Sequence, residues 1–164
     1  MRRNALVVGA LSLVFAATIA QAQDKPNFSG SWTVIADPNA AGGGGGGGRG
    51  GGGGLGQAAT ITQDAKTLTV TRTTQNGEVK LVYNLDGSDS KNMVMGRGGQ
   101  TEQVSKATWD GNKLVISTTF TMGENTATRT QTMSLDASGQ LVVTVSGPGR
   151  GGEVMTNTQT YKKG

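Results

Sequence analysis

From residue 23 onward, apolar and polar residues alternate along most of the chain, and no stretch keeps a helical period. Alternation favours β-strands, because successive side chains of a strand point to opposite faces. Turn signals rich in Gly, Asn and Asp interrupt the pattern about every 8 to 12 residues, as in sandwiches and barrels. The pattern predicts strands at residues 30–36, 58–63, 66–74, 78–85, 91–95, 100–109, 113–121, 126–135, 140–146 and 153–162.

Most connections between these strands are short and have the composition of β-hairpin turns, such as QNGE, WDGN and MGEN. A meander of hairpins must protect its two edge strands, and closing the sheet into a barrel does so. We therefore predict an all-β fold, an antiparallel up-and-down barrel of about 8–10 strands, with a glycine-rich flexible loop between the first two strands. Successive connections of such a barrel alternate between its two ends.

The alternation also indicates which side chains point into the barrel, and several of them are polar. Strand 66–74, for example, has Leu68, Val70 and Arg72 on one face and threonines on the other. A buried arginine without a partner costs several kcal/mol, so the inward polar residues either meet water in a cavity or lie near a barrel end and reach solvent. These residues are Arg72, Arg129, Gln131, Asn157 and Gln159.

The first residues have the pattern of a signal peptide. Arg2 and Arg3 supply a positive start, residues 6–17 form an apolar stretch, and the AQA segment at 20–22 has the small-residue form that signal peptidase cuts. The apolar stretch is shorter than the about 20 residues that a spanning helix needs. We predict that residues 1–22 are removed and that the protein is exported through Sec to the periplasm or the extracellular space. We expect no stable membrane insertion after cleavage.

The remaining chain, residues 23–164, has the length of one ordinary domain. Its net charge is small, because Arg2 and Arg3 contribute half of the formal charge of +4, and this argues against a nucleic-acid partner. The chain has no His and no Cys. It therefore lacks an imidazole base, a thiolate nucleophile, a disulfide and the commonest metal ligands. Most carboxylates stand beside turn residues, so we predict no enzyme, no metal and no cofactor.

A glycine run at residues 42–54 contains twelve glycines and Arg49. It has neither the Gly-Lys-Ser/Thr ending of a phosphate-binding loop nor the repeated arginines of an RNA-binding segment. Ordering about 20 such residues costs on the order of 20–40 kcal/mol, whereas closing them as a loose loop costs roughly 2.7 kcal/mol. We therefore predict that residues 38–57 form a disordered loop.

The tetrapeptide GRGG occurs three times, around Arg49, Arg97 and Arg150. In an up-and-down barrel the three connections that contain it share one end. One interpretation is an arginine rim at the barrel mouth that gathers an anionic ligand or surface. The other is coincidence in a chain with 28 glycines.

The segment NFSGSW at 27–32 resembles the first-strand G-x-W signature of the calycins, the lipocalins and fatty-acid-binding proteins. The segments ATWDGNKL at 107–114 and TQTYKK at 158–163 resemble the late strands of intracellular lipid-binding proteins. The resemblance implies structural roles for Gly30, Trp32 and Trp109. Small bacterial exported lipocalin-like domains of unknown function are similar too.

The resemblance breaks on the last strand. Many fatty-acid-binding proteins hold the ligand carboxylate there with Arg-x-Tyr, and this chain has Gln159 and Tyr161 at those positions. Glutamine cannot supply the charged bidentate fork of arginine. Arg129, on a neighbouring strand, is the candidate to replace it.

We expect an exported, non-catalytic binding protein that holds a small hydrophobic or amphipathic ligand, anionic ones included, in the barrel. The alternative is an exported protein-interaction module, such as a protease-inhibitor-like barrel without a ligand cavity. The sequence identifies no protein partner. The candidate ligand-binding residues are Arg49, Arg72, Arg97, Arg129, Arg150, Gln159 and Tyr161.

Overall fold

The computed structural model describes residues 25–35, 54–74, 77–96, 99–122, 125–149 and 153–164. The predicted signal peptide lies outside these residues, as does most of the predicted disordered loop. All regular structure in the described ranges is β-strand, and they contain no helix with the length and apolar character needed to cross a membrane.

Ten strands follow one another along the chain, and each lies within two residues of its predicted bounds. They are β1 (Gly30–Val34), β2 (Ala58–Gln63), β3 (Thr67–Thr74), β4 (Gly77–Asn84), β5 (Asp89–Gly96), β6 (Gly99–Asp110), β7 (Lys113–Met122), β8 (Asn125–Leu135), β9 (Leu141–Pro148) and β10 (Val154–Lys163).

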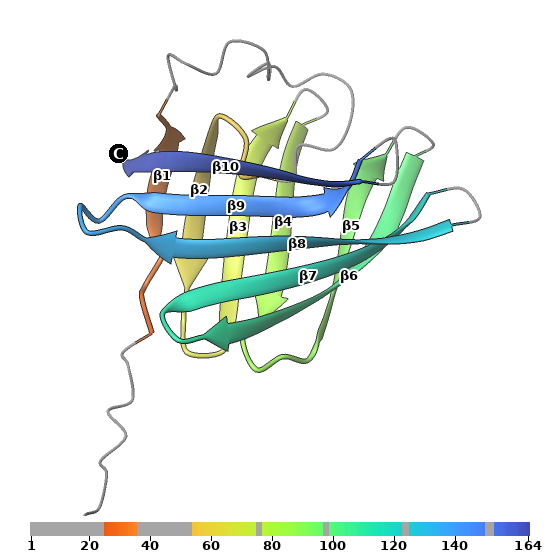
Figure 1. Ribbon diagram of the computed structural model, residues 1–164, viewed down its shortest axis with the longest axis horizontal. Coiled ribbons are helices and arrows are strands. Elements are labelled where there is room, and N and C mark those ends of the chain that lie inside the picture. Colours follow the sequence, from red (N-terminus) through yellow and green to blue (C-terminus); the bar gives the residue numbers. More distant parts are fainter. Residues whose placement is uncertain (1–24, 36–53, 75–76, 97–98, 123–124, 150–152) are drawn as a thin grey trace, which may run out of the picture.

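The strands form one antiparallel sheet in the order β4-β3-β2-β1-β10-β9-β8-β7-β6-β5. Each strand therefore pairs with its neighbours in sequence, except that β1 pairs with β10, with Val34 opposite Tyr161. The first five strands and the last five form two layers that run crosswise to each other (Figure 1). The predicted all-β, up-and-down barrel is confirmed as a nearly closed barrel of ten strands.

Side chains, rather than a backbone ladder, close the barrel between β4 and β5, which we call the seam. The amide of Asn92 accepts a hydrogen bond from the Val82 N–H (2.8 Å) and donates one to the Val82 carbonyl (2.9 Å). It thus takes the place of a peptide group of a neighbouring strand. One step along, the Asn84 N–H donates to the hydroxyl of Ser90 at 2.7 Å. Asn92 and Ser90 are both buried, and their polar groups are satisfied by these hydrogen bonds to the backbone of β4.

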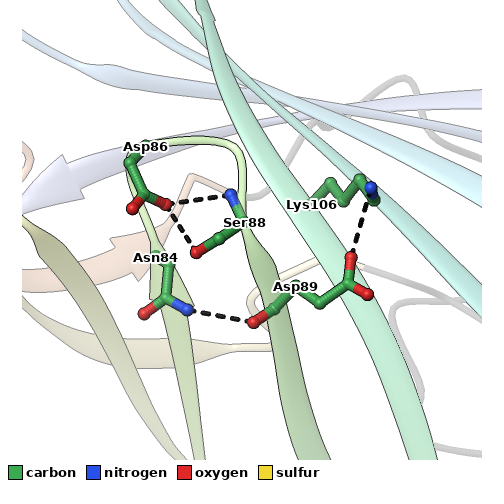
Figure 2. A network of polar contacts seen from close by, with 5 residues as sticks. All are labelled: Asn84, Asp86, Ser88, Asp89 and Lys106. Carbon is green, nitrogen blue, oxygen red and sulfur yellow. Dashed lines mark hydrogen bonds and ion pairs between the residues drawn. The ribbon is translucent and has the colours of Figure 1, made fainter.

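The turn that joins β4 to β5 is fixed by its own polar contacts, as Figure 2 shows. Asp86 accepts hydrogen bonds from the N–H and hydroxyl of Ser88, and these bonds lower the pKa of the Asp86 carboxyl. The Asn84 amide reaches across to the Asp89 carbonyl at 3.0 Å, and Lys106 of β6 pairs with the Asp89 carboxylate at 3.3 Å. The turn thereby sets the register in which Asn92 meets Val82.

The apolar core fills the end of the barrel that carries the short turns at 64–66, 85–88, 111–112 and 136–140, which we call the turn end. Phe28 is fully buried there, and its ring stacks on Trp109 with centroids 5.9 Å apart. Trp32 is buried as well, and its indole N–H donates to the Phe28 carbonyl at 2.8 Å. Gly30 begins β1 with a φ of 146°, a conformation that glycine adopts without strain. These contacts seal the turn end.

Replacing Asn92 with Leu should destabilise the protein by about 2–4 kcal/mol, because the N–H and the carbonyl of Val82 are then both left unpaired. Urea unfolding measures the change in free energy. The hydrogen-exchange rate of the Val82 amide should increase in the same variant.

Lys91→Leu is the matched control, since Lys91 is the preceding residue on β5 and points outward in an exposed ion pair of 3.6 Å. Such a pair contributes little. Equal stability losses for the two variants would contradict the role given to Asn92.

Candidate functional site

The inward face changes from apolar to polar halfway along the strands. On β3 it runs from Leu68 and Val70, both buried, to Arg72. On β8 it runs from Met133, which is fully buried, through Gln131 to Arg129. Beyond this level the inward residues become half-buried, so the half of the barrel away from the turn end, the loop end, has a polar interior that reaches solvent.

Arg72 stands at this boundary with its hydrogen-bonding capacity only partly used. One terminal nitrogen, Nη1, donates to the Gly54 carbonyl at 2.6 Å. The Nε atom is buried and has no hydrogen-bond partner. A guanidinium offers five N–H donors, so most of those of Arg72 remain available.

Arg129 reaches the same interior from β8, on the other layer of the barrel. Its guanidinium lies over the ring of Phe120, 5.0 Å from the centroid, and this cation–π contact is its partner among the described residues. Burial lowers the pKa of Arg129, and the positive charge of Arg72 lowers it further. The two guanidinium groups therefore lie close enough to repel each other.

Tyr83 of β4 completes the group. Its side chain is buried, and burial raises its pKa to about 12 even though the charges of Arg72 and Arg129 act in the opposite direction. The phenol is therefore neutral near pH 7, and its hydroxyl can donate a hydrogen bond. Its hydroxyl has no hydrogen-bond partner among the described residues.

No described carboxylate offsets the two interior charges. The ion pairs of the described chain join Lys91 to Glu102 and Lys106 to Asp89, all of them exposed. Every acidic residue that the structure describes is exposed, in a turn or on the outer face of the barrel. These are Asp64, Glu78, Asp86, Asp89, Glu102, Asp110, Asp136 and Glu153. The interior thus combines two cations and a neutral donor without a counter-anion, and we call Arg72, Arg129 and Tyr83 the cationic cluster.

Gln159 and Tyr161, two other predicted ligand residues, are occupied by structural contacts. The Tyr161 hydroxyl donates to Gln159 Oε1 at 2.7 Å and accepts from the Leu55 N–H at 3.2 Å. Burial raises the pKa of Tyr161. These contacts hold Leu55 in the core and place the neighbouring Gly54 carbonyl against Arg72.

Gly54 leaves room for this arrangement, since a Cβ there would overlap Gln159 Oε1, lie 3.2 Å from the Tyr161 hydroxyl and displace the Gln159 side chain. The last residues of the predicted disordered loop, 54–57, thus belong to the barrel. Gln57 adds a backbone bond, accepting from the Val34 N–H at 2.9 Å.

Arg49, Arg97 and Arg150 lie outside the described residues, so the arginine rim stays a prediction. The meander does place the connections that follow β1, β5 and β9 at one end of the barrel. Of the seven residues predicted to bind ligand, the structure brings Arg72 and Arg129 together and gives Gln159 and Tyr161 a supporting position. Tyr83 and Phe120 were not predicted, although the alternation places both on inward faces.

A cleft of about 350 Å3 lies at the turn end, apart from the cationic cluster, beside Trp109, Asn27, Gln63 and Asp64. Three of its polar side chains already hold local contacts. Gln63 bonds the Phe28 N–H and the Pro26 carbonyl, and Asn27 bonds the Ser29 N–H. The N–H groups of Lys66 and Thr67 bond Asp64 and lower the pKa of its carboxyl. The cationic cluster, in which Arg72 Nε and the Tyr83 hydroxyl have no hydrogen-bond partner among the described residues, is therefore the stronger candidate.

Compared with protein-family models and with curated proteins, the chain matches none of them.

Tyr83 should make the protein less stable as the pH rises from 10 to about 12. The unfolded phenol loses its proton near its ordinary value of 10.0, whereas the folded phenol keeps it up to about 12. Stability is fully present below pH 10 and falls by about 2–3 kcal/mol across this window. Urea unfolding at several pH values measures the fall.

Tyr83→Phe should lose less stability over the same window, because it has no proton to release at that position. The contribution of Tyr161 is common to both proteins and cancels in the comparison. Parallel curves for the two proteins would show that Tyr83 is not the group that titrates.

Replacing Arg129 with Met should raise the free energy of unfolding in low-salt buffer, because it removes a partly desolvated charge that Arg72 repels. Arg129→Lys keeps the charge and should give no such gain. A loss of stability in the Met variant would mean that the contact with Phe120 outweighs the repulsion.

Proposed function

We propose that the chain is an exported calycin-like binding protein and that it holds an organic anion with an apolar portion inside the loop-end half of the barrel. Its role is non-catalytic. The anionic group contacts Arg72 and Arg129, and the Tyr83 hydroxyl donates a further hydrogen bond to it.

The observation that carries this proposal is the pair of interior guanidinium groups without a carboxylate. Charges that are neither paired nor fully hydrated are costly, and evolution retains such strain chiefly where a function needs it. An anion would accept charge-assisted hydrogen bonds from the free donors of Arg72 and relieve the repulsion of Arg129. Tyr83, kept neutral by burial, adds a donor without adding charge.

Apolar side chains in the same half favour a ligand that is more than a simple ion. Phe120 is half-buried beneath Arg129. Leu81 and Val145 are partly buried and pack against the core. Pockets that combine apolar walls with a few convergent polar groups suit amphipathic molecules. The turn end is sealed by the aromatic contacts of Phe28, so the ligand enters from the loop end.

Features beyond the site support the family and the compartment in this proposal. The ten-stranded meander and the buried Trp32 after Gly30 agree with a calycin barrel. The positive start, the apolar stretch and the AQA segment of residues 1–22 agree with export. A protein-interaction role, in contrast, would leave the cationic cluster unexplained.

Isothermal titration calorimetry should detect binding of laurate, a twelve-carbon anionic amphiphile. Dodecyltrimethylammonium also has a twelve-carbon chain but carries the opposite charge, and it should not bind. Arg72→Met and Arg129→Met should each weaken laurate binding by about 10-fold to 100-fold, the value of a charge-assisted hydrogen bond.

Lys80→Met is the matched control, since Lys80 is an exposed cation on β4 that points away from the interior. It should leave the affinity unchanged. Equal binding of the anionic and cationic amphiphiles, or full affinity in both arginine variants, would contradict the proposal.

A further inference from the structure

Two methionines on the outer face of β5 are unusually open to solvent. Met93 is 53% exposed and Met95 is 55% exposed. They are separated by one residue, Val94, whose side chain points to the other face. Exposure at this level gives the two side chains little packing energy and leaves their sulfur atoms accessible to an ion from solvent.

The strand geometry brings the two thioethers within reach of one common atom. Residues i and i+2 of a strand lie on the same face about 6.8 Å apart. A methionine has three rotatable bonds beyond Cα. Both sulfur atoms can therefore converge on an ion held about 2.3 Å from each, a distance typical of metal–sulfur bonds.

The surroundings leave this space open. Toward β4, the strand faces the seam, where Val82 is the exposed neighbour. Toward β6, Met93 stands opposite Glu102 and Met95 opposite Gln100. Lys91, the preceding residue on this face, pairs with Glu102, so its positive charge is balanced.

We propose that Met93 and Met95 form a binding site for a soft monovalent metal ion, Cu(I). This inference is independent of the function proposed for the cationic cluster, because the two sites lie on opposite faces of the barrel wall.

The donor chemistry selects the metal. Thioethers are soft, neutral ligands that favour Cu(I), whereas Mg²⁺ and Ca²⁺ require oxygen and Zn²⁺ prefers thiolate or imidazole. The chain has no Cys and no His, so methionine sulfur is the softest donor that it offers. Among the described residues, β5 is the strand on which two exposed methionines share one face.

The test is competition for Cu(I) with bicinchoninate under nitrogen and ascorbate. The full chain should withdraw one Cu(I) per molecule from the chelator. Met93→Leu and Met95→Leu should each weaken the affinity at least tenfold, since even loss of an outer-shell partner costs about that much in metal affinity. The double variant should not compete at all.

Met155→Leu is the matched control. Met155 is 62% exposed on β10 and has no second methionine at i±2, so its variant should keep the wild-type affinity. All these leucine substitutions conserve volume at exposed positions, and circular dichroism should show unchanged folds. Cu(I) binding that survives in the Met93/Met95 double variant, or that falls equally in Met155→Leu, would overturn the assignment.

A second readout uses Ag(I), a soft monovalent ion that has no accessible redox step. In NMR spectra of the wild-type protein, Ag(I) should shift the methyl signals of Met93 and Met95 and leave that of Met155 in place. Equal shifts at all three would indicate unspecific thioether contacts and would also overturn the assignment.

Discussion

The antiparallel pairing of β1 with β10 is the contact on which the barrel depends. It joins the two ends of the described chain, with Trp32 opposite Lys163 and Val34 opposite Tyr161. All other ladders form between strands that are neighbours in sequence. Because Tyr161 is locked against β1, its hydroxyl can hold Leu55, and the Gly54 carbonyl meets Arg72. The ordering of the interior thus starts from this one pairing.

The interior of the barrel has an apolar half and a polar half. The turn-end half contains the fully buried residues, such as Phe28 and Leu114, and supplies the hydrophobic free energy. The loop-end half carries the charges of Arg72 and Arg129, which no described carboxylate offsets, and we expect these charges to oppose folding. Such a division lets the protein keep a costly electrostatic arrangement, because the apolar half is sealed independently of it.

The strands could be predicted because each of them alternates and ends at a recognisable turn. The inward positions of Arg72 and Arg129 followed from the same alternation. The seam could not be predicted, since Asn92 is one polar residue among several on β5 and only the register across to Val82 reveals its bonds. The contacts of Gln159 and Tyr161 could not be predicted either. The two side chains bond each other, and Tyr161 also bonds the Leu55 N–H, which follows a glycine run that has no pattern of its own.

The position of the seam has a consequence for the order in which the chain folds. The two strands that lack a shared ladder, β4 and β5, are consecutive, whereas the two strands farthest apart in sequence are paired. The Gly164 N–H even bonds the Ser31 carbonyl at 2.8 Å. If the chain were circularly permuted, with residue 164 joined to residue 25 and new termini in the turn at 86–88, every ladder would link sequential strands. The native connectivity therefore assigns its largest loop closure to one strand pair, β1 and β10, and this pair raises the contact order of the fold.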